Sequence, residues 1–542
     1  MLLIIMALLI LTGLYIFSKY GICKSAKAEA LALYASLIAL LWAIIGLGLS
    51  YNNLQSMLML IHKSKDWCNI LPTYCTEPKW HNLSIEALNM LDKETLYLEY
   101  SNYLNKGVGI LDIAQSVYLG IDYGTFDGLS AVFVALTVII SPIAILACEK
   151  KTEMLASLLL VEALLIGAFV TYDFITFYAL FESVLIPMFF LIGGTGSGAT
   201  FFRTNAAYRL FLYTLAGSVL MLLALILLYL ETGTLNWYHL VLKSVYTGVA
   251  GTTAEEVQNS ISFITNYKTY SLILFPLIFI AFAVKVPMIP FHLWLPEAHT
   301  IAPTPGSMIL AALLLKLGGY GILRWLMPIF PEATVFYSPF ILVIALISTS
   351  YACLTCLRQI DVKRIVAYSS IVHMNICIYS IFTLNPLAIK GAIFEMFSHG
   401  IISTGMFFLI GLVYNRHDTR ILKYFRGLVL QMPVFTTIFF IFILANSAVP
   451  LTCGFIGEFI MFGGSMGALP LLTTVLAIST IINAGYNIWL FNRMCFGQYS
   501  PYLVKAKDIT RKEAYVLAPL LFYIVLLGIC PNFVFMLIDG SL

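Results

Sequence analysis

Residues 272–299, LILFPLIFIAFAVKVPMIPFHLWLPEAH, and residues 305–326, PGSMILAALLLKLGGYGILRWL, are two neighbouring apolar runs that each contain a lysine. Each run is long enough to cross the roughly 30 Å hydrocarbon core of a bilayer as a helix. Lys285 and Lys316 are therefore expected at membrane depth, where an ammonium group costs at least about 2.5 kcal/mol unless it is paired or deprotonated. Packing does not explain such a cost, so the two lysines predict a path for ions.

The composition of the whole chain indicates a polytopic membrane protein. Apolar residues make up 61% of the 542 residues and charged residues 11%, and the mean hydropathy is +0.93. Because apolar windows of about 20 residues recur from end to end, we expect an all-α fold of about 14 transmembrane helices. The first is not interpreted as a secretory signal, because no basic segment precedes it. The expected spans are 1–17, 30–50, 126–148, 154–172, 174–193, 208–230, 270–298, 305–327, 335–357, 362–383, 388–413, 432–466, 468–495 and 514–537.

The distribution of Lys and Arg predicts the orientation of these spans. Counted together with the span ends beside them, the odd-numbered connections hold 19 of the 30 basic residues and the even-numbered ones hold 9, while Lys285 and Lys316 lie deeper in their spans. Because basic residues concentrate on the matrix or cytoplasmic side, the odd-numbered connections should face that side. Both termini and the polar stretch 61–125, interpreted as an extramembrane loop, then lie opposite. Three regions are expected, namely 1–125, a core over 126–495 and a C-terminal part over 496–542.

Motifs that suggest redox or nucleotide chemistry are better explained by packing or by loops. Cys353 and Cys356 form C-L-T-C at the end of an apolar span without a second pair, so helix packing is the preferred interpretation. Cys68 and Cys75 lie in the long polar stretch, where a disulfide is left open. The run GGTGSG at 193–198 follows a transmembrane helix instead of a strand and is interpreted as a flexible connection.

The sequence contains no P-loop and no cysteine cluster with the spacing of an iron–sulfur site. We therefore expect the chain to bind no NADH, iron–sulfur cluster or ATP itself. The energy for any transport must then come from elsewhere.

Six ionisable residues inside apolar spans are the candidates for carrying ions. Glu182 lies about 12 Å into its span and Lys316 about 16 Å past Pro305, at 1.5 Å per residue, which places both near the middle of the membrane. The candidates are Glu182, Lys285, Lys316, His373, His399 and Glu458.

Each candidate also has a structural interpretation. A single His in a membrane helix is often a hydrogen-bonded packing residue, which leaves both readings open for His373 and His399. Glu182 is compatible with a fixed partner for one lysine. Glu395 lies one helical turn before His399, on the same face. It is expected to be a carboxylate near the helix end that reaches water, in preference to an added member of the relay.

Proton transfer is the chemistry that fits lysines with carboxylates and histidines nearby. Loss of hydration disfavours a charged lysine, whereas a neighbouring carboxylate favours it. A glutamate that approaches or leaves Lys285 would therefore switch the amine between holding and releasing a proton. Histidine suits the relay, because its ordinary pKa of about 6.5 lets it accept and donate near neutrality.

Two spans are interrupted, which supplies polar backbone at depth. Pro287 and Pro290 break the seventh, and Pro450, Gly454 and Gly457 loosen the twelfth, five helices later. Interruptions at matching positions of two halves indicate an inverted-repeat transporter with its site at the midplane. The expected five-helix repeats cover 154–327 and 335–495.

Three segments resemble the antiporter-like membrane subunits of NADH:ubiquinone oxidoreductase, respiratory complex I, and among them the subunit 4 family. The segments are DFITFYALFESVLIP at 173–187, VKVPMIPFHLWLPEAHTIAPTPGSMILAALLLKLGGYG at 284–321 and DVKRIVAYSSIVHMN at 361–375. The resemblance implies fourteen helices with discontinuous helices 7 and 12, and proton-relay roles for all six candidates. Glu458 favours subunit 4, because sibling subunits tend to carry lysine on helix 12.

The resemblance also implies partners and location. NADH, FMN, iron–sulfur clusters and ubiquinone would belong to partner subunits, while this chain lies in the lipid bilayer beside other membrane-arm subunits, with no role for nucleic acid. The mitochondrial inner membrane is the expected location, and a bacterial inner membrane is the alternative. Two other functions stay open, a stand-alone cation/proton antiporter subunit and a non-pumping membrane scaffold, although the scaffold leaves both lysines unexplained.

Overall fold

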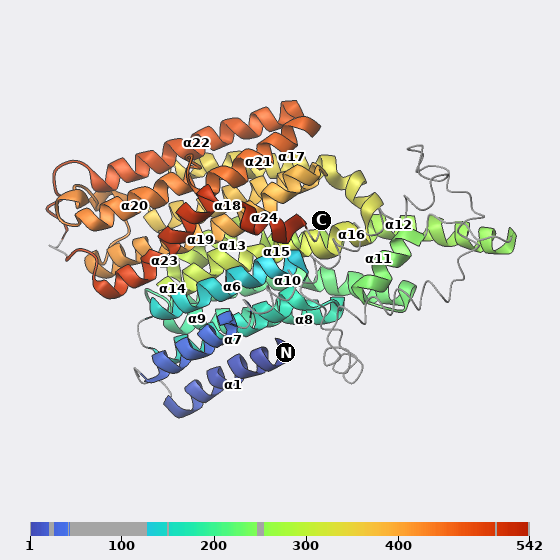
Figure 1. Cartoon of the computed structure of the whole chain (residues 1–542), viewed down its shortest axis with the longest axis horizontal. Coiled ribbons are helices and arrows are strands. Elements are labelled where there is room, and N and C mark those ends of the chain that lie inside the picture. The colour runs from blue at the N-terminus through green and yellow to red at the C-terminus, as the bar shows by residue number, and fades with distance from the viewer. Residues whose placement is uncertain are drawn as a thin grey trace, which may run out of the picture.

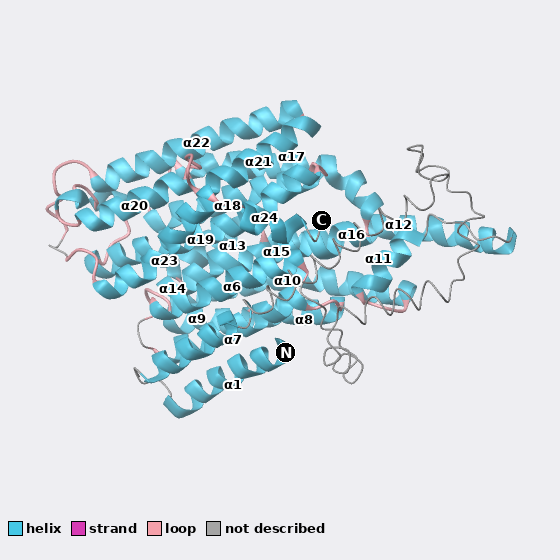
Figure 2. Ribbon diagram, viewed as in Figure 1, coloured by secondary structure: helices cyan, strands magenta, loops and turns pink. Residues whose placement is uncertain are grey.

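The computed structural model describes residues 2–20, 27–41, 43, 127–148, 151–246, 254–503 and 507–539. This part of the chain is helical, and its only strand-like pairings are two isolated bridges, Asp173 with Asn236 and Asp361 with Ile421 (Figure 2). Ten of its helices are long and apolar enough to cross a membrane. The expected all-helical polytopic fold is confirmed. The loop expected at 61–125, with Cys68 and Cys75, lies outside the described residues.

Most helices of the first half match the expected spans to within a few residues. The exceptions are an additional α11 and the helices α10 and α12, which start earlier, while the expected span 30–50 lies only partly within the described residues. Their bounds are α1 Leu2–Tyr20, α6 Gly128–Leu146, α7 Thr152–Val170, α8 Phe174–Ser183, α9 Leu185–Thr195, α10 Thr200–Thr232, α11 Trp237–Tyr246, α12 Ala254–Lys285, η1 Phe291–Leu293, α13 Trp294–Ile301, α14 Thr304–Ile309, η2 Leu310–Leu314, α15 Leu315–Gly321, η3 Ile322–Leu326 and α16 Met327–Ile329.

The second half continues with two long central helices and ends in a pair of shorter ones. Their bounds are α17 Pro331–Cys356, α18 Val362–Phe382, α19 Pro386–His417, η4 Leu422–Tyr424, η5 Leu428–Leu430, α20 Pro433–Asn446, α21 Cys453–Ala468, α22 Pro470–Cys495, α23 Arg511–Ile529 and α24 Asn532–Asp539.

The helices run roughly side by side, with α22 and α1 at opposite edges of the bundle (Figure 1). Helices α18 and α19 lie at its centre, and their apolar windows are completely buried, whereas α22 and α23 are mostly exposed on the outside. Because outer faces of such a bundle contact lipid, polar side chains are tolerated mainly on the central helices. This arrangement places Lys316, His373 and His399 on spans that are almost completely buried.

The predicted break of the seventh helix is confirmed. Helix α12 ends at Lys285, and the chain turns through residues 286–290 before α13. Backbone groups freed at this break are satisfied by side chains: the Trp294 indole donates to the Val284 carbonyl at 3.0 Å, and Ser348 Oγ accepts from the Ile289 amide at 3.0 Å. Such compensation is required where backbone lies at membrane depth.

The predicted break of the twelfth helix is confirmed as well. Helix α20 ends at Asn446 and α21 begins at Cys453. Between them Ala448 and Leu451 adopt positive φ angles of 52° and 72°, which change the direction of the chain. The Asn483 amide donates to the Asn446 carbonyl at 3.1 Å and so caps the end of α20.

The eighth span contains a feature that the apolar pattern did not predict. Two π-helical segments, η2 and η3, flank α15, so Lys316 follows directly after a widened turn. Single π-turns of this kind are frequent at functional sites. Here the widened turn leaves the Ala311 carbonyl available to the Lys316 ammonium, which donates to it at 2.7 Å.

Two smaller expectations were also tested. Cys353 and Cys356 are free and fully buried, with their thiols facing the Ser479 and Ile365 carbonyls, which confirms the packing interpretation. The run 193–198 ends α9 and leads into α10, so it is a helix connection, and the Ser197 amide donates to the Ile301 carbonyl at 2.8 Å.

Candidate functional site

The centre of the site is a contact between Lys316 and His399. The Lys316 Nζ lies 2.8 Å from His399 Nδ1, and both side chains are almost completely shielded, at 0% and 1% exposed. A distance of this size permits direct proton transfer between the two nitrogens. The pair joins α15 to α19, two spans that are separated by 83 residues in the chain.

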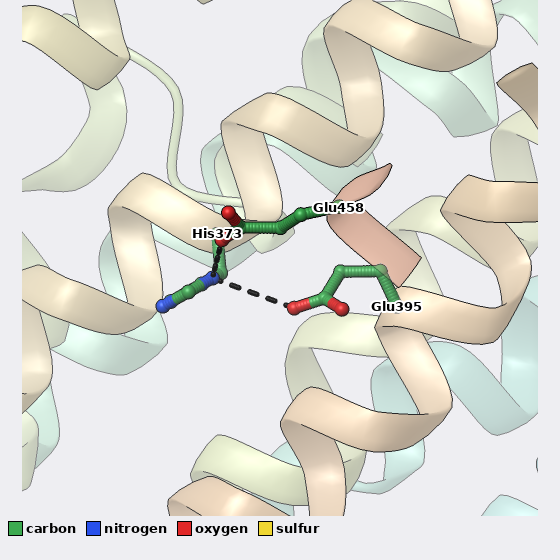
Figure 3. A group of neighbouring side chains, drawn as sticks. All are labelled: His373, Glu395 and Glu458. Atoms are coloured by element: carbon green, nitrogen blue, oxygen red, sulfur yellow. Dashed lines mark ion pairs between the residues drawn. The ribbon is translucent and has the colours of Figure 1, made fainter. Parts of the chain in front are cut away.

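A second histidine continues the line from this pair. The rings of His399 and His373 have centroids 5.3 Å apart, and His373 on α18 is 3% exposed. Its Nδ1 lies 3.4 Å from Glu395 Oε1 and 3.3 Å from Glu458 Oε1, so one ring nitrogen faces two carboxylates (Figure 3). The line therefore runs from a lysine through two histidines to a pair of acids.

The expectation that Glu395 reaches water near the helix end is wrong. Its side chain is 1% exposed and faces His373 and Glu458, because α19 begins at Pro386 and Glu395 lies more than two turns inside it. Two glycines allow this position: a Cβ atom at Gly457 would lie 2.3 Å from Glu395 Oε2, and one at Gly391 would lie 2.7 Å from the Met461 amide nitrogen. Glycines at these points allow α21 to approach α19 closely.

Lys285 and Glu182 form a separate part of the site. Lys285 is 2% exposed and its Nζ lies 4.5 Å from the centroid of the Phe181 ring, so the cation faces an aromatic surface. Among the described residues neither Nζ nor the two buried Glu182 oxygens have a hydrogen-bond partner, although the Glu182 charge acts on Lys285. Helix α8 carries both Phe181 and Glu182 and so supplies both neighbours of the lysine.

The two parts of the site meet along α15. A Cβ atom at Gly318 would lie 3.2 Å from Lys285 Cβ and 2.9 Å from the Phe282 carbonyl, and one at Gly319 would lie 2.4 Å from Met396 Sδ. The glycines of LKLGGYG thus let α12 pack on one side of α15 and α19 on the other. The structure brings Lys316, His399, His373 and Glu458 into one line and places Lys285 and Glu182 beside it.

Other buried ionisable residues were not identified from the sequence. Glu162 on α7 is 1% exposed, and both of its carboxylate oxygens are shielded. It is a single glutamate in the apolar run MLASLLLVEALLIG, so the criterion that identified Glu182, an ionisable residue deep in an apolar span, could also have identified Glu162. His299 is fully buried and stacked on Phe407 at 4.4 Å, and its charge interacts with Lys363 and Lys316.

A cavity of about 210 Å³ lies near the end of α19 and the start of α14. Three basic side chains line it, Lys151, Lys363 and Arg420. The Lys363 Nζ donates to the Ala302 carbonyl at 2.7 Å, next to the loop that begins α14. The cavity therefore lies at one end of the two helices that carry Lys316 and His399.

Among the described residues, one group of metal-binding type exists, formed by His373, Glu395 and Glu458, whose nearest ligand atoms lie within 4.8 Å of one another. The same geometry serves a proton, because nitrogen and carboxylate oxygens at 3.3–3.4 Å need only a small closure to hydrogen-bond distance.

Comparisons with known proteins show the family of this chain. Residues 171–483 match the family model described as NADH:quinone oxidoreductase/Mrp antiporter, TM. The chain is 39% identical over 485 residues to NADH-ubiquinone oxidoreductase chain 4 of Marchantia polymorpha, covering 88% of this chain and 90% of the relative. It belongs to the NADH-ubiquinone oxidoreductase chain 4 family.

Two further similarities support the chain 4 assignment. The protein of the same name from Arabidopsis thaliana is 43% identical over 421 residues, which cover 77% of this chain and 79% of that protein. A chain of respiratory complex I from Thermus thermophilus with bound NADH superimposes with a TM-score of 0.67 at 26% identity, covering 77% of this chain and 84% of that one. The matched region contains all six candidate residues of this chain 4 protein.

Proposed function

We propose that this chain 4 protein translocates protons as a membrane subunit of NADH:ubiquinone oxidoreductase, through the line of buried side chains that begins at Lys285 and ends at Glu458. The observation that carries the proposal is the 2.8 Å contact between Lys316 Nζ and His399 Nδ1 in surroundings shielded from water and lipid. A lysine held there without a carboxylate in contact gains stability by giving up its proton. The neighbouring imidazole is the acceptor that the geometry offers.

The order of residues supports a path in two stages. Lys285 receives its electrostatic support from Glu182 and Phe181, so a shift of Glu182 changes how firmly the proton is held. Lys316 then passes a proton to His399, and His373 carries it toward Glu458. An imidazole can both accept and donate a proton, because it has two ring nitrogens. The His299 side chain and the basic cavity offer a connection from Lys316 toward one end of the bundle.

The proposed architecture is that of fourteen spans in two inverted repeats, over 154–327 and 335–495, within a core over 126–495. Two interruptions five helices apart support it, at the end of α12 and between α20 and α21. The regions 1–125 and 496–542 are proposed to lie outside the repeats.

The proposed partners follow from membership of the chain 4 family. NADH, FMN, iron–sulfur clusters and ubiquinone are assigned to other subunits, and neighbouring antiporter-like chains are expected beside this one in the mitochondrial inner membrane. Moving one charge across a membrane costs about 2.3 kcal/mol per 100 mV, so redox chemistry elsewhere must drive the relay. Purification of the native complex checks this point, because a stand-alone antiporter would lack flavin and iron–sulfur partners.

Replacement of Lys316 by alanine tests the function. The variant removes the proton donor of the His399 contact, so we expect assembly of the complex but loss of coupled NADH oxidation and proton pumping in reconstituted vesicles. Lys390→Ala is the matched control, because its amine pairs with Asp539 at the partly exposed bundle surface. Normal numbers of protons per electron in Lys316→Ala would exclude Lys316 from the path.

A further inference from the structure

Glu395 adds a second carboxylate at the end of the line of proton-carrying residues. Its Oε1 lies 3.4 Å from His373 Nδ1, the same ring nitrogen that Glu458 contacts (Figure 3). Its Oε2 accepts from Ser398 Oγ at 2.9 Å. Both oxygens therefore face polar atoms, although the residue is 1% exposed. The Glu395 side chain is therefore held by polar contacts inside the protein and does not extend to solvent.

The charge balance of this cluster requires an additional positive charge. Two ionised carboxylates with one imidazolium would leave a net negative charge in a region of low dielectric, which is costly. The other titratable groups that act on Glu395 come from three helices: His373 and Cys377 on α18, Glu458 and Cys453 on α21, and Lys316 on α15. Of these, Lys316 already donates to Ala311 and His399. A proton on one of the two carboxylates therefore neutralises the cluster.

We propose that Glu395 is a proton-carrying residue that shares His373 Nδ1 with Glu458. When its net charge is zero, the cluster of His373, Glu395 and Glu458 holds two mobile protons, one on the imidazole and one on a carboxyl group. A cluster of His373 with one carboxylate would hold one mobile proton at zero net charge. This inference rests on the proposed function and extends it to a residue outside the six candidates.

The transfer step is simple to balance. A proton leaves the imidazolium of His373 as its N–H bond breaks, and an O–H bond forms on Glu395 or Glu458. The neutral imidazole keeps its Nε2–H bond, and its free Nδ1 can accept the next proton. The hydroxyl of Ser398 stabilises Glu395 while the carboxylate is charged, because it donates to the second oxygen.

Infrared difference spectroscopy of the intact complex in oxidised and NADH-reduced states, with Glu395→Gln, tests the proposal. Glutamine keeps the size of the side chain but cannot hold the mobile proton. We expect loss of a carboxylic-acid C=O band and a fall in the rate of coupled pumping of about tenfold or more, as for the loss of a general acid–base group. Glu231→Gln, an exposed site at the end of α10, should leave both unchanged.

Two further variants make the outcome decisive. Glu395→Asp retains a carboxyl group, so it should shift the carboxylic-acid C=O band and restore part of the pumping rate. The same variant tests the proposal if Glu395→Gln fails to assemble. Lys316→Ala separates this inference from the proposed function: pumping lost in Lys316→Ala but normal in Glu395→Gln, with an unchanged band, overturns only the role of Glu395. One equivalent of tightly bound metal in the native complex that is lost in Glu395→Gln would also overturn it, because a cation would then balance the charge.

Discussion

The surroundings of Lys285 show how a membrane protein can hold an amine that is neither ion-paired nor solvated. Its Nζ faces the Phe181 ring at 4.5 Å, a contact worth about 0.5–2 kcal/mol, which is less than the cost of burying an ammonium group. Support from Glu182 is electrostatic and acts without a hydrogen bond. The balance between the charged and neutral forms is therefore close, as proton exchange requires.

Lys285→Arg tests whether the lysine must lose its proton. A guanidinium remains charged in proteins, so it would keep the positive charge and stop the exchange. We expect coupled NADH oxidation and pumping to fall by about tenfold or more, close to the loss in Lys285→Ala. Lys390→Arg at the surface pair with Asp539 should have no effect. Full activity of Lys285→Arg in vesicles would mean that a fixed charge is sufficient.

Arg324 provides the opposite case, a buried charge with a structural role. Its guanidinium pairs with Asp127 and lies 4.4 Å and 4.0 Å from the ring centroids of Tyr172 and Trp237. Lysine cannot reproduce the planar stacking, so Arg324→Lys should reduce the stability of the folded subunit by about 1–2 kcal/mol. The measurement is the midpoint of thermal disassembly, with the ratio of protons to electrons expected to stay normal. A changed ratio would place Arg324 in the proton path.

The sequence identified candidates by a single criterion, an ionisable residue deep in an apolar span, and this criterion does not depend on partners. The criterion therefore selected the six residues, but it could not show that His373 contacts both Glu395 and Glu458. Glu395 was misjudged because its depth depends on where α19 begins and on a glycine of α21 that lies 62 residues away. Contacts between distant segments have no local pattern in the chain.

At the scale of elements, the interrupted helices are stabilised by side chains from their neighbours. Trp294 and Ser348 satisfy backbone groups at the first break, and Asn483 does so at the second. Proline and glycine positions predicted both breaks, because these residues act on the local backbone. The π-turns around α15 were not predictable, because they preserve the apolar composition of the span.

Gly457→Ala tests the close packing of α19 and α21. The new methyl group would lie 2.3 Å from Glu395 Oε2 and 3.0 Å from Glu395 Cα, so the helices or the carboxylate must move. We expect a loss of about 1–3 kcal/mol in stability, and slower pumping as Glu395 leaves His373. Gly463→Ala, six residues along the same helix, meets no atom within 4 Å and should behave as the parent. Equal behaviour of the two variants would show that α21 has room to shift.

At the scale of the whole molecule, the connections segregate to two ends of the bundle. Ser197, Thr300 and Arg420 are joined by hydrogen bonds, which brings odd-numbered connections together. At the other end the Phe174 amide donates to the Leu235 carbonyl at 3.0 Å, which joins even-numbered connections. The alternation expected from fourteen spans is therefore present in the described core, and the excess of basic residues lies at the end that carries the basic cavity.

Cysteine labelling from one side of the membrane tests the orientation. Lys423→Cys places an exposed thiol in the odd-numbered connection after α19, and Glu231→Cys places one at the even-numbered end of α10. Because basic residues concentrate on the matrix or cytoplasmic side, a membrane-impermeant maleimide applied there should react with position 423 and not with position 231. Labelling is measured relative to the parent, whose exposed Cys530 supplies the background. Applied from the opposite face, the reagent should reverse the pattern, since position 231 then lies in its compartment. Reaction of both positions from one face would contradict the alternation and, with it, the placement of the basic cavity at the end where the odd-numbered connections gather.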